Sequence, residues 1–168
     1  PVKTIYDNAF YEKYDITSVL IPESVTSIGN SAFSWCTSLT SVVIPDSVMR
    51  IEHEAFSGCS ELLEVQIPDG ITEIQSYTFS ACFKLDHVVL PQNCTSIDIG
   101  AFSVCSGLTE ITLPAGLRSI GNYAFADCSK LESATFGKLT LLGDYAFFKT
   151  KLAKTPELDG LSEIGASA

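Results

Sequence analysis

One motif of 23 residues recurs along almost the whole chain. Its clearest marker is an Ala-Phe pair, and the phenylalanines of two successive copies, Phe33 and Phe56, lie 23 residues apart. Three other columns share the period: an Ile-Pro or Leu-Pro pair, a cysteine and an isoleucine, represented by Pro45, Cys59 and Ile51. Four columns with one period indicate a repeat architecture, in which each unit buries its apolar side against its neighbours.

A single unit, taken from Leu39 to Glu61, predicts its own local structure. Val42 and Ile44 alternate with other residues and therefore point to one face of a short strand. Pro45 has no N–H to donate to a sheet and ends that strand. The Ala-Phe-x-x-Cys segment, residues 55–59, is short enough to form one helical or 3₁₀ turn.

These units predict an α/β-type repeat solenoid of the leucine-rich-repeat kind. We expect a right-handed coil with short parallel β-strands on one face and short helical or 3₁₀ turns on the other. The solenoid forms one domain over residues 1–168, with about seven units of 22–23 residues. The chain begins and ends within a unit, so we expect it to be a fragment of a longer array.

The pattern departs from regularity in the first unit and near the C-terminus. Lys13 occupies the cysteine column of the first unit, and Phe136-Gly137 replaces the usual Ile-Pro pair. The last strand column reads Leu152, Thr155 and Glu157, which is poorly apolar. We expect these units to be partly exposed or irregular.

The charge balance excludes some partners. The chain carries 20 acidic and 10 basic residues, a formal net charge of −10. Nucleic acids and anionic membrane surfaces are recognised by basic surfaces, so neither is an expected partner. No apolar run reaches the ~18 residues of a membrane span, so we expect no membrane insertion.

The cysteine and phenylalanine columns are best interpreted as core. Free cysteine behaves as a small, buried hydrophobe, so we predict buried free thiols. Disulfides between neighbouring units and a metal site remain alternatives, although no close Cys-x-x-Cys pair occurs. Cys94 lies in an aliphatic column and is also predicted to be buried. The phenylalanines predict a stacked spine of core rings, whereas Trp35 either contributes to binding or covers local apolar surface.

The residues that alternate with the buried strand positions define an outward face. Glu64, His87 and Glu110 share one outward column and are predicted to lie side by side. Either His87 is a solvated cross-strand partner of these carboxylates, or the three mark a recognition patch or, less readily, a weak metal site. The candidate partner-binding residues of this face are Leu20, Val43, Glu64, Gln66, His87, Val89, Glu110 and Thr112.

The chain contains no short catalytic motif. Patterns of the GxGxxG, P-loop, GxSxG and HExxH types do not occur in the sequence. We therefore predict no enzymatic activity, no catalytic residues and no cofactor.

The order Leu-x-x-Val-x-Ile-Pro, Ile and Ala-Phe-x-x-Cys resembles the BspA-type leucine-rich repeat family over residues 2–168. This resemblance implies a curved solenoid in a surface-exposed or secreted protein, with adhesin-like binding and no catalytic residues. The expected partner is a protein or glycan bound through the outward strand face. The alternative is a structural spacer that presents another domain. Exposed ends also make end-to-end self-association of the chain an expectation.

Overall fold

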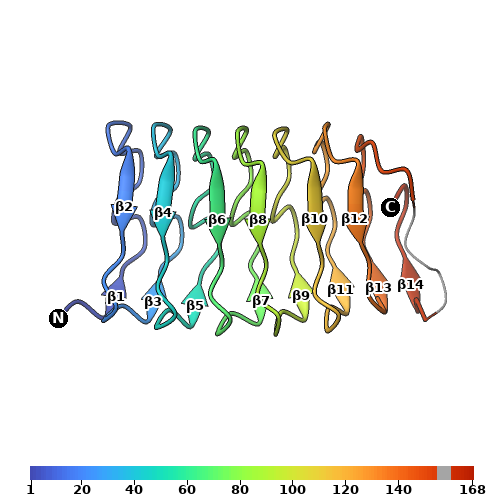
Figure 1. Cartoon of the computed structure of the whole chain (residues 1–168), viewed down its shortest axis with the longest axis horizontal. Coiled ribbons are helices and arrows are strands. Elements are labelled where there is room, and N and C mark those ends of the chain that lie inside the picture. Colours follow the sequence, from blue (N-terminus) through green and yellow to red (C-terminus); the bar gives the residue numbers. More distant parts are fainter. Residues whose placement is uncertain (155–159) are drawn as a thin grey trace.

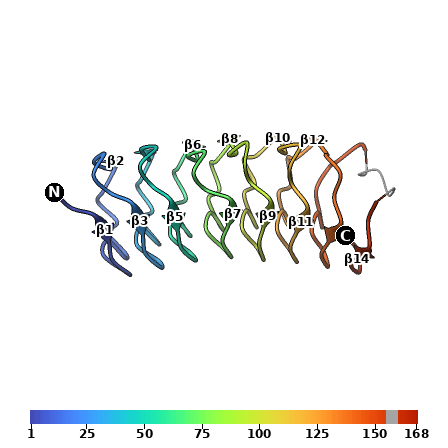
Figure 2. The same cartoon turned by 90° about the horizontal axis from the view of Figure 1, so that it is seen from below.

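The computed structural model describes residues 1–154 and 160–168, which wind into one elongated coil of successive turns (Figures 1 and 2). The strands lie in two rows along the long axis, and the turns up to β12 contribute one strand to each row (Figure 1). Each strand pairs in parallel with the equivalent strand of an adjacent turn, 22 or 23 residues away in the sequence. The predicted parallel-strand solenoid is therefore present; its right-handed winding stays a prediction.

The first row contains the strands that the sequence predicted. In each of them the middle residue points into the coil and the two flanking residues point outward. In β6, for example, Val65 is buried and its neighbours Glu64 and Gln66 are exposed. Parallel register joins β2 to β4, β6 to β8 and β10 to β12. The strands of this row are β2 (Ser18–Leu20), β4 (Ser41–Val43), β6 (Glu64–Gln66), β8 (His87–Val89), β10 (Glu110–Thr112) and β12 (Ser133–Thr135).

A second row of two-residue strands runs along the other side of the coil. The chain reaches it through a turn after each proline, as where the Val48 N–H donates to the Pro45 carbonyl at 3.0 Å. Each second residue of these strands is apolar, and all but those of β1 and β14 are buried in the core. The strands are β1 (Thr4–Ile5), β3 (Ser27–Ile28), β5 (Arg50–Ile51), β7 (Glu73–Ile74), β9 (Ser96–Ile97), β11 (Ser119–Ile120), β13 (Leu141–Leu142) and β14 (Glu163–Ile164).

The prediction of helical or 3₁₀ turns is wrong, because the described residues contain no helix. Glu54, just before the Ala-Phe-x-x-Cys segment, and Gly58, within it, have φ angles of 57° and 73°. Left-handed residues cannot continue a right-handed helix. Between them the N–H donors alternate: Ala55 N–H bonds within its turn to Glu52 at 3.3 Å, whereas Phe56 N–H bonds to Thr78 of the next turn at 2.9 Å.

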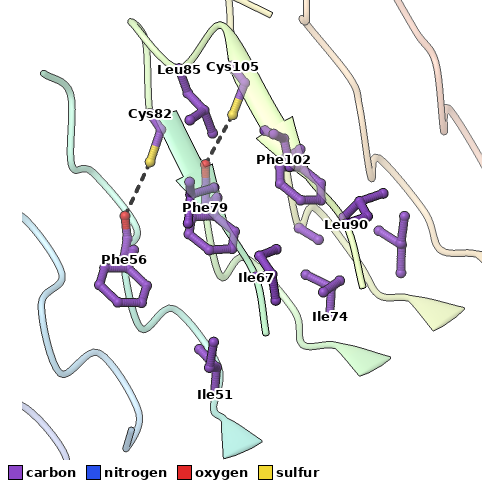
Figure 3. Packing of buried hydrophobic residues seen from close by; sticks show 14 of the residues in the cluster. Ile51, Phe56, Ile67, Ile74, Phe79, Cys82, Leu85, Leu90, Phe102 and Cys105 are labelled. Atoms are coloured by element: carbon purple, nitrogen blue, oxygen red, sulfur yellow. Dashed lines mark hydrogen bonds between the residues drawn. The ribbon is translucent and has the colours of Figure 1, made fainter. Parts of the chain in front are cut away.

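The core contains the predicted spine of phenylalanine rings (Figure 3). Phe79 lies between Phe56 and Phe102, with ring centroids 5.5 Å away on each side and nearly parallel planes. All three rings are fully buried. At the N-terminal end Phe10 stacks only on Phe33, at 5.0 Å, and is 38% exposed.

The six cysteines are free and buried, as the sequence predicted. Each cysteine of the repeating column donates its S–H to a carbonyl of the preceding turn, as Cys82 does to Phe56 at 3.3 Å (Figure 3). The same Phe56 carbonyl also accepts the Cys59 N–H of its own turn. The thiol is thus a small apolar filler that also uses the second lone pair of a buried carbonyl.

The C-terminal turns are less regular, as expected. Phe136, which replaces Ile-Pro, is partly buried and packs edge-on against Phe147 with centroids 5.5 Å apart. No strand of the first row follows β12 among the described residues. Thr155 and Glu157, two of the three members of the last predicted strand column, lie outside the described residues.

Replacing a ring inside the spine will cost more stability than replacing the ring at its end. Phe79→Ala removes a fully buried side chain stacked on both sides and should lower the free energy of unfolding by about 3–5 kcal/mol. Phe10→Ala removes a ring with one stacked neighbour and partial exposure, so its loss should be clearly smaller. Urea unfolding followed by circular dichroism measures both, and equal losses would contradict a stacked core.

The buried thiols predict a loss of stability in alkali. Burial raises the pKa of Cys94 to about 11 and that of Cys128 to about 12. An unfolded thiol has a pKa of about 8.5, so the folded chain holds more protons above that pH. The contribution of each thiol to stability is complete below this value and is lost as the pH rises through the folded-state pKa.

Urea unfolding at pH 8 and pH 10.5 tests this expectation, with Cys94→Val as the matched variant. Valine occupies the same column at Val25 and Val48, and it does not titrate. The variant should lose less stability between the two pH values than the natural chain. An identical loss in both proteins would contradict a buried, protonated Cys94 in the folded state.

Candidate binding face on the three-residue strands

The outward side chains of the six three-residue strands form one continuous face of the coil, which we call the strand face. Strands β4, β6, β8 and β10 show the same pattern of an exposed, a buried and an exposed residue. The alternation follows from the pleat of a strand, whose successive side chains point to opposite sides. The coil therefore presents two outward side chains per turn at fixed positions along its axis.

The structure places all eight sequence-predicted residues on the strand face, and each of them is exposed: Leu20, Val43, Glu64, Gln66, His87, Val89, Glu110 and Thr112. Three of them are large aliphatic side chains in contact with solvent. Leu20 is 76% exposed, Val43 57% and Val89 41%. Leu20 and Val43 are register partners in β2 and β4, so their apolar surfaces adjoin.

The predicted trio of Glu64, His87 and Glu110 occupies three neighbouring strands. Glu64 and His87 are register partners in β6 and β8, and β8 contacts β10, which carries Glu110. Across the described part of the chain, none of the three takes part in an ion pair within 4.0 Å. The carboxylates of Glu64 and Glu110 and the ring nitrogens of His87 are therefore available to a bound molecule.

A hollow of about 460 Å³ opens on the strand face across β4, β6 and β8. Its sides carry the aliphatic groups of Val43 and Val89, and its polar groups include three carboxylates. We call it the acidic hollow. The residues that line it are Glu23, Val42, Val43, Ile44, Pro45, Asp46, Glu64, Val65, Gln66, His87 and Val89.

A second hollow, of about 530 Å³, lies beside the first, where the chain enters the strands. We call it the lysine hollow, since Lys84 and Lys130 line it. His87 lines both hollows, so they adjoin at this residue. The residues that line the lysine hollow are Leu63, Phe83, Lys84, Asp86, His87, Gly107, Thr109 and Lys130.

Sequence reasoning missed the apolar residues of the lysine hollow. Leu63 is 48% exposed and Phe83 is 46% exposed, and both precede a strand rather than lying in it. A signal for them exists in the sequence. The column of Leu63 holds Thr40 and Thr109, and that of Phe83 is otherwise mostly polar, so both are apolar exceptions at surface positions.

The two hollows of the strand face have no enclosed interior. Both hollows are open to solvent, so neither encloses a reacting group and excludes water around it. In residues 1–154 and 160–168, no group of three or more His, Cys, Asp or Glu side chains is placed to hold a metal ion. The same residues contain no helix long and apolar enough to cross a membrane.

Trp35 lies away from the strand face, at a left-handed position of the turn segment with a φ of 60°. Its indole covers Gly58 of the next turn, where an added Cβ would come within 2.8 Å of the ring. Trp35 is 46% exposed. This contact supports the interpretation in which Trp35 covers local surface, and it explains the glycine in its column.

Comparison with solved structures identifies several bacterial relatives. The chain is 34% identical to a leucine-rich repeat protein from Bacteroides ovatus, with a TM-score of 0.77 over 98% of this chain and 49% of that one. It is 30% identical to the T. pallidum leucine-rich repeat protein, with a TM-score of 0.89 over 100% of this chain and 80% of that one. A leucine-rich cell surface protein from Faecalibacterium prausnitzii is 33% identical, with a TM-score of 0.63 over 95% and 46% of the two chains.

The chain thus spans about half the length of the Bacteroides ovatus and Faecalibacterium prausnitzii proteins. No curated protein matches it. The family description "BspA type Leucine rich repeat region" matches in 6 copies, over residues 3–132 and 63–168. With its 23-residue units, its parallel strand ladders and these matches, the chain belongs to the BspA-type leucine-rich repeat family.

Proposed function

We propose that the chain is a non-catalytic binding module of a cell-surface or secreted protein, and that its strand face binds a protein or glycan in the manner of an adhesin. The observation that carries this proposal is the pair of adjoining hollows on one face. They bring exposed aliphatic and aromatic side chains together with charged side chains, of which the carboxylates of the acidic hollow are in no ion pair within the described residues and Lys84 of the lysine hollow pairs with Glu61. An exposed apolar area bordered by polar groups is typical of an interaction site.

The relatives support the proposed location. The Faecalibacterium prausnitzii relative is described as a cell surface protein. Repeat solenoids also suit binding, because an extended face offers many side chains to a large partner without a closed pocket. End-to-end self-association remains a prediction from the sequence.

The alternative is a structural spacer that holds another domain away from a surface. Its main support is the regular stacking of the turns, because an elongated array of repeats suits a spacer as well as it suits a binding module. The two functions differ in one measurable property. A spacer shows no saturable binding through the strand face, whereas a binding module does.

A binding screen of the folded chain against extracellular-matrix proteins and glycans tests the proposal. For any saturable ligand, the double variant Val43→Ser, Val89→Ser should weaken binding by roughly tenfold or more, about 1.4 kcal/mol. The physical reason is that both side chains are exposed beside the acidic hollow and would be buried by a partner.

Met49→Ser is the matched control. Met49 is 56% exposed, almost the same as Val43, but it lies in the turn that leads to the second row of strands. Its replacement should leave binding unchanged. Absence of any saturable ligand, or an equal loss in the control and the double variant, would favour the spacer.

A further inference from the structure

The acidic hollow has an unbalanced charge. Glu23, Asp46 and Glu64 line it, and no lysine or arginine does. None of the three carboxylates belongs to an ion pair within the described residues. Glu23 and Asp46 stand at the same position of neighbouring turns, 23 residues apart, in the turns that follow β2 and β4, and adjacent paired strands such as these are ~4.8 Å apart. Like charges so placed repel each other, and a cation between them would relieve that repulsion.

We propose that the acidic hollow binds a basic polypeptide segment of a partner protein. The lysine or arginine side chains of this segment pair with Glu23, Asp46 and Glu64. Its apolar side chains pack on Val43 and Val89, which border the same hollow. This inference rests on the proposed function of the strand face and names the partner of that face.

Four other occupants fit the hollow less well. Acidic glycans and nucleic acids carry negative charges that the three carboxylates repel. Sugar rings pack their C–H groups on the electron-rich faces of aromatic rings, and no Phe, Tyr or Trp lines this hollow. A divalent cation needs several oxygen ligands around one point, and these carboxylates do not form such a group in the described residues.

A basic polypeptide meets each property of the hollow. In an extended peptide the side chains of residues two positions apart point to the same side, so a lysine and a valine separated by one residue can both face the carboxylates and the valines of the hollow. The excess of acidic residues over the whole chain, with a net charge of −10, also speeds the approach of a basic partner.

Three labelled ten-residue peptides test the inference with the natural chain. One repeats the order lysine, serine, valine, serine, so that lysine and valine share one side of the extended peptide, and the other two carry glutamate or glutamine in place of lysine. Fluorescence anisotropy should show saturable binding of one lysine peptide per chain, weakened by added salt, and no binding of the other two at the same concentrations. Equal binding of the glutamate peptide would overturn the inference.

Two double variants locate the binding. Asp46→Asn with Glu64→Gln removes two charges of the hollow without changing side-chain size and should weaken the lysine peptide roughly fivefold. Glu12→Gln with Glu73→Gln removes the same number of exposed charges outside the hollow and should have little effect. An equal effect of both double variants would show attraction by net charge alone and would overturn the site.

The two proposals can fail separately. If the lysine peptide does not bind but a ligand from the screen depends on Val43 and Val89, the basic partner is wrong and the binding module stands. If the peptide fails and no ligand depends on the strand face, both proposals are wrong.

Discussion

Hydrogen bonding between the backbones of successive turns is the constraint on which the structure depends. In the turn segment the Phe56 N–H donates to the Thr78 carbonyl, and in both strand rows each strand pairs with the equivalent strand of an adjacent turn. Peptide groups buried without a partner are costly, so every turn must offer its donors and acceptors at the positions its neighbours require. Unit length can therefore vary little, and equivalent side chains stack directly on one another.

This stacking divides the side chains into two classes. Inward columns must hold residues that fill the same space in every turn, which explains the phenylalanine spine and the cysteines that donate to carbonyls of the preceding turn. Outward columns have no such requirement. On the strand face one column changes from Leu20 and Val43 to Gln66 and then Val89. A regular scaffold can thus carry an irregular surface, and the proposed site lies where the columns change character.

Much of the candidate site could be predicted because strand alternation is a local property. Residues such as Glu64 and His87 are exposed since their neighbour in the same strand is buried, and that follows from the pleat alone. Leu63, Phe83 and Lys84 were missed because they precede the strands. In those segments no simple periodicity predicts the direction of a side chain. Their contribution depends on how the turns are stacked, which brings residues of three units to one hollow.

The sequence by itself determined the repeat length, the parallel strands of the first row and the identity of the core columns, since a strict period leaves each unit only its neighbours to pack against. Only the tertiary structure decided the second strand row and the absence of helix in residues 1–154 and 160–168. Residues such as Glu54 adopt a left-handed conformation, with a φ of 57°, because their N–H groups bond to the next turn. Such bonds join residues 22 positions apart, so no local pattern specifies them.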